Sequence, residues 1–148
     1  MSRLYPRAPL VGVAAVVFEN ESVLLVRRGK APRRNEWGLP GGLQKVGETI
    51  FAAACREVLE ETALHIEVLC LADVVDLIER ESENGRVRYH YTLVDFVGCR
   101  ASGSICAGSD AVDAAWFELR NLDRCALWAE TRRVIGLAYE KWLAAGSP

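Results

Sequence analysis

Apolar and polar stretches divide the chain into short predicted elements. Residues 10–18 are apolar and rich in β-branched side chains, which predicts a strand buried on both faces. A polar turn at 19–21 leads into the apolar run 22–26, so the two runs predict a β-hairpin. A basic, polar loop over 27–36 and a rigid, glycine-rich segment over 37–42 follow.

The second half continues this mixture of elements. Residues 49–62 have helical spacing, and 65–78 are apolar and extended. Asn84-Gly85 is a two-residue hairpin signal, after which the side chains of 87–94 alternate as in a strand. A small-residue loop over 101–108 and a short strand over 114–119 lead to a closing helix. Its predicted apolar face consists of Leu127, Thr131, Val134, Ile135, Ala138 and Trp142.

The order of these elements predicts the fold class. Strands and helices are mixed, but they do not alternate as in a doubly wound parallel fold. We therefore expect an α+β protein, an αβα sandwich in which helices flank a mixed β-sheet. No repeat or linker interrupts the sequence, so residues 1–148 are interpreted as one domain.

Composition narrows the class of protein. The 148 residues are 51% hydrophobic and 26% charged, with a net charge of −2, which is typical of a globular domain that neither coats nucleic acid nor crosses a membrane. The five cysteines form no C-x-x-C pair, so we expect no zinc framework or disulfide scaffold and a cytoplasmic location. Arginine supplies 15 of the 18 cations, and its planar fork suits phosphate and carboxylate.

The helix predicted over 49–62 carries a group of carboxylates. At 100° per residue, Glu57, Glu60 and Glu61 share one face, with the small residues Ala53 and Ala54 beneath and beside it. The opposite, apolar face is predicted to dock onto the sheet. It consists of Phe51, Cys55, Val58, Leu59 and Thr62.

Like charges three and four residues apart destabilise a helix, and carboxylates near its C-terminus oppose the helix dipole. A divalent cation reverses these penalties, and oxygen ligands alone favour a hard ion such as Mg²⁺ or Mn²⁺. The alternative is an ordinary solvated acidic face.

Glycines surround this helix. Gly41 and Gly42 lie upstream, and Gly47 precedes Glu48. Successive backbone N–H groups in such a loop can form an anion-binding nest. Arg56 and Glu48 are eight residues apart and meet only if the loop folds back onto the helix. A phosphate-binding loop beside a metal-binding helix is an arrangement for phosphoryl chemistry.

These residues resemble the signature of the Nudix hydrolase family, Gly-x5-Glu-x7-Arg-Glu-U-x-Glu-Glu-x-Gly-U, where U is a bulky aliphatic residue. Eight of the nine defined positions match, and the exception is Ala63 in place of glycine. The matching residues are Gly42, Glu48, Arg56, Glu57, Val58, Glu60, Glu61 and Leu64. The family's glycine permits a left-handed helix cap, so for Ala63 we expect a local adjustment without loss of activity.

The resemblance implies hydrolysis of a nucleoside diphosphate linked to another moiety. By position, Glu57, Glu60 and Glu61 bind Mg²⁺, which Mn²⁺ can replace, with Gly42 as a further metal contact. Glu48 supports them, and Arg56 orients the carboxylates through a salt bridge. Our candidate for the general base is Glu60. The alternative is an acid from a later loop, Asp110 or Asp113, whose other interpretation is turn chemistry.

Candidate substrate contacts lie mostly before the helix. They are Arg27, Arg28, Trp37, Gly41, Gly42 and His90. For the arginines the alternative is a solvated basic loop, and for Trp37 and His90 it is a structural role.

The chain looks most like small bacterial ADP-ribose pyrophosphatases, which release AMP and ribose 5-phosphate and are often homodimers. The rival functions are cleavage of nucleoside triphosphates and a non-catalytic role as a nucleotide sensor or RNA-cap binder.

Overall fold

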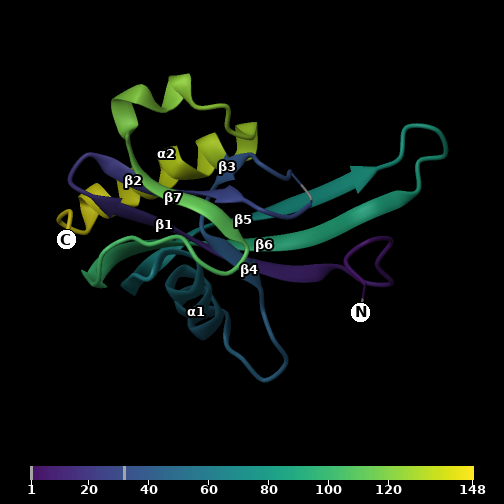
Figure 1. Cartoon of the computed structure of the whole chain (residues 1–148), viewed down its shortest axis with the longest axis horizontal. Helices are drawn as coiled ribbons and strands as arrows, with labels where there is room; N and C mark the ends of the chain where they lie inside the picture. The colour runs from purple at the N-terminus through teal and green to yellow at the C-terminus, as the bar shows by residue number, and fades with distance from the viewer. Residues whose placement is uncertain (1, 32) are drawn as a thin grey trace.

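The computed structural model describes residues 2–31 and 33–148, and one mixed β-sheet forms its centre (Figure 1). The strands are β1 (Leu10–Glu19), β2 (Ser22–Arg28), β3 (Trp37–Gly38), β4 (Gly41–Leu43), β5 (His65–Arg80), β6 (Val87–Ser102) and β7 (Ala111–Glu118). The order β3-β2-β1-β6-β5 forms the main path, while β4 pairs with β1 and β7 with β2. Helix α1 (Ile50–Thr62) covers one face and α2 (Ala129–Ala144) the other (Figure 1), so the predicted fold class is confirmed.

Strand β1 lies at the centre of the sheet. It forms the predicted antiparallel hairpin with β2, in which Phe18 lies opposite Val23, and it runs parallel to β6. Its residues from Val13 to Phe18 are almost all buried, because α1 packs on one face of the sheet and α2 on the other. The prediction of a strand buried on both faces is therefore confirmed.

Helix α1 packs through a face that only partly matches the predicted one, since Val58 and Thr62 are buried as expected. Phe51 and Leu59 are exposed, whereas the buried residues are Ala53, Ala54, Val58, Glu61 and Thr62. The two alanines pack with Val13 of β1 and Phe96 of β6. Their small side chains let the helix approach the sheet closely. The sheet therefore fills the space beside the acidic face, and Glu61 lies on the side of the helix that faces the sheet.

Helix α1 ends in a left-handed cap despite the side chain of Ala63. The φ and ψ angles of Ala63 are 65° and 9°, and its N–H donates to the carbonyl of Leu59 at 2.9 Å. The expected local adjustment is therefore wrong, because the alanine adopts the conformation that the family's glycine favours.

Other boundaries differ from the sequence-based expectations. Asn84 and Gly85 belong to a four-residue turn closed by the N–H of Glu81 and the carbonyl of Arg86, so the predicted two-residue hairpin is wrong. Segment 37–42 contributes the short strands β3 and β4, and β2 extends into the predicted loop as far as Arg28. An unpredicted 3-10 helix spans Leu119–Arg124. Among the described residues, no helix is long and apolar enough to cross a membrane.

Candidate functional site

Arg56 ties the loop before α1 to the helix. Its Nε and Nη2 atoms donate to the two carboxylate oxygens of Glu48 at 2.6 and 2.9 Å, and Nη2 also donates to the carbonyl of Leu43 at 3.0 Å. Thr49 caps the helix by accepting from the N–H of Ala52 at 3.0 Å, which turns Glu48 back toward Arg56. The guanidinium of Arg56 lowers the pKa of Glu48 to about 2. From the sequence, Glu48 and Arg56 were expected to meet only if the loop folds back onto the helix. The structure shows that the loop does so.

The same guanidinium also contacts two carboxylates of the acidic helix face. Its Nη1 atom lies 2.7 Å from a carboxylate oxygen of Glu57 and 3.2 Å from one of Glu60. The side chain of Glu57 is 15% exposed and that of Glu60 is 41% exposed. Arg56 thus reduces the like-charge repulsion along the helix, and Glu60 remains the more accessible of the two carboxylates.

Glu61 is the buried carboxylate of the group. It is 8% exposed and accepts a hydrogen bond from the backbone N–H of Gly41 in β4 at 2.7 Å. Burial raises the pKa of Glu61, and the negative charges of Glu57 and Asp110 raise it further. The hydrogen bond from Gly41 and the positive charge of Arg28 lower it in part, so that the pKa is about 7. The N–H of Gly41, expected to form part of an anion-binding nest, is directed to this carboxylate.

The two glycines of β4 permit a close approach between the sheet and the acidic face. A Cβ atom at Gly42 would lie 2.4 Å from the carboxyl carbon of Glu57, and one at Gly41 would lie 2.1 Å from the carbonyl oxygen of Val13. Any larger residue at either position would displace β4 from β1 or Glu57 from its place.

The chemistry of these side chains fits a hard divalent cation. Among the described residues, no three Asp, Glu, His or Cys side chains are grouped closely enough to hold a metal by themselves. Mg²⁺ at nucleotide sites, however, typically takes one or two carboxylates and completes its shell with phosphate and water. Glu57 and Glu61 flank the β4 glycines and interact electrostatically, so they are the pair best placed for that role, with Glu60 on the accessible side.

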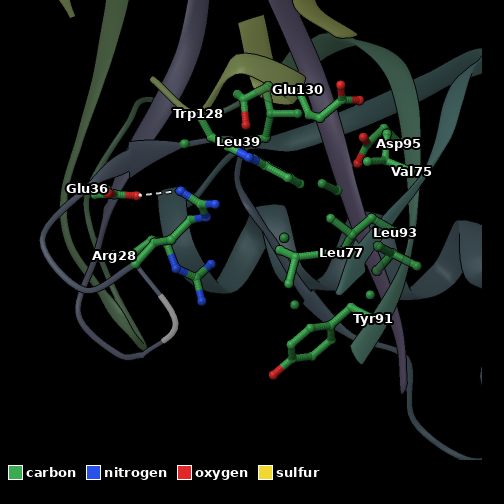
Figure 2. A pocket seen from close by; sticks show the side chains of 18 of the residues that line it. Arg28, Glu36, Leu39, Val75, Leu77, Tyr91, Leu93, Asp95, Trp128 and Glu130 are labelled. Carbon is green, nitrogen blue, oxygen red and sulfur yellow. Dashed lines mark hydrogen bonds and ion pairs between the residues drawn. The ribbon is translucent and has the colours of Figure 1, made fainter. Parts of the chain in front are cut away.

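A cleft of about 140 Å³ opens on the other side of β4. Figure 2 shows Arg28 and Tyr91 toward one end of this cleft and Trp128, Glu130 and Asp95 toward the other. Four of the predicted substrate contacts line it, namely Arg28, Trp37, Gly41 and Gly42. These four residues thus line the same cleft, and β4 lies between that cleft and the acidic face of α1.

Two predicted substrate contacts lie outside the cleft lining. His90 alternates with Tyr89 and Tyr91 along β6, and because Tyr91 faces the cleft, His90 lies on the opposite face of the sheet. Arg27 lies opposite Asp113 in the pairing of β2 with β7, while the neighbouring Arg28 reaches the cleft.

The loop before β7 lies over the C-terminal end of α1. The N–H of Gly108 donates to the carbonyl of Glu61 at 3.1 Å, which brings Asp110 near the acidic group. The carboxylate of Asp110 forms an ion pair with Lys30 at 3.0 Å. Asp113 instead lies inside strand β7, where it accepts from the N–H of Ala114 at 2.8 Å, so the turn given as its alternative role is wrong.

The structure adds cleft residues that the sequence-based list lacks. Asp95 of β6 and Trp128, immediately before α2, lie more than 30 residues apart in the sequence but line the same cleft. The alternation along β6 places Asp95 on the face of Tyr91, and that signal was available in the sequence. Nothing in the sequence indicated that Trp128 would reach this face.

Comparisons with known proteins find similar sequences over most of the chain. A family model described as the NUDIX domain matches residues 8–137. An ADP-ribose pyrophosphatase of Methanocaldococcus jannaschii is 35% identical over 124 residues, which are 84% of this chain and 70% of that protein. The human 8-oxo-dGDP phosphatase NUDT18 is 33% identical over 120 residues, and these cover 81% of this chain but 35% of that protein.

Solved structures share the fold. A MutT NUDIX hydrolase from Burkholderia pseudomallei superposes with a TM-score of 0.75 at 29% identity, covering 88% of this chain and 98% of that one. The NUDIX domain of Shewanella oneidensis NrtR, in complex with ADP-ribose, gives a TM-score of 0.73 at 24% identity, covering 91% of this chain and 89% of that one.

Proposed function

This chain belongs to the NUDIX hydrolase family and is therefore a pyrophosphatase, and we propose that it cleaves ADP-ribose into AMP and ribose 5-phosphate with Mg²⁺ as cofactor. The observation that carries the proposal is the arrangement around β4. The acidic group of α1 contacts Gly41 and Gly42, and these same glycines line the cleft. A diphosphate beside β4 would thus lie near both the carboxylates and Arg28.

Glu57, Glu60 and Glu61 are the residues proposed to hold Mg²⁺. When bound, Mg²⁺ neutralises phosphate charge and lowers the pKa of water toward that of a usable nucleophile. Arg56 holds Glu48, Glu57 and Glu60 in place and is a positioning residue. Glu60 remains our proposed general base because its carboxylate is the most accessible of the three, and Asp110 is the alternative, near Glu61.

ADP-ribose is proposed because the archaeal relative that carries this activity in its name matches 84% of the chain. The second candidate substrate class is an oxidised nucleotide, which is supported by the similarity to the 8-oxo-dGDP phosphatase NUDT18. Cleavage of nucleoside triphosphates, the rival expected from the sequence, remains a prediction. The cysteine usage of the sequence supports a cytoplasmic setting. The homodimer implied by the family resemblance remains a prediction.

A substrate panel tests the proposal. Release of AMP or nucleoside monophosphate is measured for ADP-ribose, NADH, dinucleotides and nucleoside triphosphates, with Mg²⁺ and with a chelator. We expect the highest kcat/KM for ADP-ribose, loss of turnover with the chelator, and a loss of at least about 100-fold in Glu61→Gln. Glu118→Gln, at an exposed glutamate of β7, is the matched control and keeps wild-type turnover.

Two results would contradict the proposal. Preferential turnover of an oxidised nucleotide would replace ADP-ribose by the second candidate, and preferential turnover of a triphosphate would replace it by the rival expected from the sequence. Absence of turnover for every substrate, with Glu61→Gln making no difference to nucleotide binding, would favour a sensor.

A further inference from the structure

The inner part of the cleft holds a buried acid that the proposed hydrolysis does not use. Asp95 lies in β6, opposite Ala14 of β1 and Asp73 of β5, and is only 5% exposed. It nevertheless lines the cleft, on the side of Val75 and toward Trp128 and Glu130 (Figure 2).

The described part of the chain supplies no hydrogen-bond donor to the Asp95 carboxyl group. The guanidinium of Arg133, the nearby cation, is directed to Asp73 at 2.8 Å and to Glu130 at 2.7 Å. The backbone N–H of Val74 likewise donates to Asp73, at 2.8 Å. Buried polar groups normally have a partner, and leaving one without costs free energy. A carboxyl group that lines a cleft in this state is suited to meet a ligand.

The charges around Asp95 favour a neutral partner. Asp73 faces it from β5, and Glu130 and Arg133 approach from α2. Burial, together with the charge of Asp73, raises the pKa of Asp95 to about 7, so the carboxyl group is largely protonated in mildly acidic solution and partly so at neutral pH. A protonated carboxyl group both donates and accepts a hydrogen bond.

The two ends of the cleft differ in what they can bind. Arg28 and the β4 glycines lie at the end near Glu61, where a diphosphate is attracted and can approach the backbone closely. At the other end, the guanidinium of Arg133 is already paired with Asp73 and Glu130, so the groups around Asp95 do not attract phosphate. The walls there include Leu39, Val75 and Trp128, and the guanidinium of Arg33 lies over the Trp128 ring, 4.6 Å from its centroid. Apolar side chains, an aromatic ring and a planar guanidinium suit a flat, uncharged heterocycle. With the diphosphate at β4, the nucleobase therefore extends toward Asp95.

We propose that Asp95 is a specificity-determining residue that fixes an amino-substituted nucleobase, such as adenine. Its carboxyl group donates a hydrogen bond to a ring nitrogen and accepts one from the exocyclic amine. This assignment rests on the proposed function, which places a nucleoside diphosphate in the cleft, and it extends that function by naming the residue that contacts the base.

The test compares ADP-ribose with an analogue in which unsubstituted purine replaces adenine. The analogue lacks the exocyclic amine but keeps the ring, the sugars and the diphosphate. For the wild type we expect kcat/KM to fall about tenfold on removing the amine, which is the effect of one hydrogen bond. Asp95→Asn keeps both a donor and an acceptor and retains this ratio. Asp95→Leu brings the ratio close to one.

The ratio within each variant is the readout, so a general loss of stability or activity in a variant does not affect it. Asp76→Asn is the matched control, because it changes an exposed acid of the neighbouring strand β5 that does not line the cleft, and the tenfold preference should remain. An equal ratio in the wild type and Asp95→Leu would overturn the proposal even if ADP-ribose is a good substrate.

A binding measurement separates this proposal from the proposed function. AMP and purine riboside monophosphate are titrated while the fluorescence of the cleft tryptophans is followed, which requires no turnover. Suppose that ADP-ribose is not hydrolysed, but AMP binds about tenfold more tightly than the purine analogue, and only in proteins with Asp or Asn at position 95. The proposed hydrolysis is then wrong, and the role of Asp95 in binding the base is supported. If AMP and the purine analogue bind the wild type equally, the role of Asp95 is wrong.

Discussion

At the scale of single residues, the end of α1 shows that a local geometry can persist without the residue that favours it. Ala63 has a φ angle of 65°, where its Cβ atom crowds the following carbonyl. Its N–H still closes the helix on Leu59, and the N–H groups of Cys106 and Gly108 bind the carbonyls of Thr62 and Glu61 just before it. The loop that carries Asp110 therefore depends on this helix end.

We predict that Ala63→Gly stabilises the protein. Relief of the left-handed strain, about 1–2 kcal/mol, exceeds the entropy cost of glycine, about 0.5–1 kcal/mol. The expected gain of about 1 kcal/mol in unfolding free energy corresponds to a rise of about 2–4 °C in Tm. Calorimetry checks it, with Ala144→Gly in the last turn of α2 as a control that should be destabilised. A fall in Tm for both variants would contradict the account.

At the scale of elements, α1 functions together with the loop that precedes it. The Thr49 cap and the ion pair between Glu48 and Arg56 fix the angle at which the chain enters the helix. The same arginine then reaches Glu57 and Glu60. The side chain of Arg56 thus fixes the position of both the loop and the carboxylates. Its planar guanidinium can do so because it presents several hydrogen-bond donors in fixed directions.

We predict that Arg56→Lys lowers kcat/KM by about 10–100-fold, because an ammonium cannot reproduce the paired hydrogen bonds to Glu48 while also holding Glu57. Turnover of ADP-ribose at saturating Mg²⁺ gives the measurement, and circular dichroism verifies that the fold is retained. Arg120→Lys, at an arginine whose side chain is 80% exposed, is the control and should match the wild type. Equal activity in Arg56→Lys would show that a single positive charge is sufficient.

At the scale of the whole molecule, the sheet separates two groups of acids. Glu61 lies on the α1 side, against β4, and Asp95 lies on the cleft side, near α2. Both are buried, and burial raises the pKa of each to about 7. The unfolded chain binds fewer protons than the folded protein between about pH 4.5 and 7, so these two groups make folding less favourable as the pH rises through this window.

We predict that the wild type, in the absence of metal, has a lower unfolding free energy at pH 8 than at pH 5.5. For Asp95 alone, a pKa raised from 3.8 to about 7 corresponds to at most about 4 kcal/mol at pH 8. Urea unfolding of the wild type and Asp95→Asn at the two pH values is the measurement. The variant should be more stable than the wild type at pH 8, and the difference should shrink toward pH 4. An equal difference at both pH values would contradict the role of ionisation.

The strands and helices were largely predictable because local patterns determine them. The β-branched run of β1, the helical spacing of α1 and the apolar stripe of α2 all appear in the structure within a few residues of their predicted bounds. The signature residues around Glu48 and Glu57 also indicated the family, because their spacing depends only on the sequence. The four-residue turn at Asn84-Gly85 was not predicted, since the dipeptide alone does not determine loop length.

Tertiary structure determined which groups meet across the sheet. The helical wheel placed Val58 and Thr62 on the buried face of α1, as observed, but it also placed Phe51 and Leu59 there, and both are exposed. The close fit of Ala53 and Ala54 against Val13 and Phe96 turned the helix and buried Glu61. Likewise, Asp95 and Trp128 belong to one cleft only because α2 packs over β6. The sequence by itself determined which chemical groups the protein carries and their order, because spacing is local. Packing decided which of them are buried and which face a common space, because that depends on the fit between distant segments.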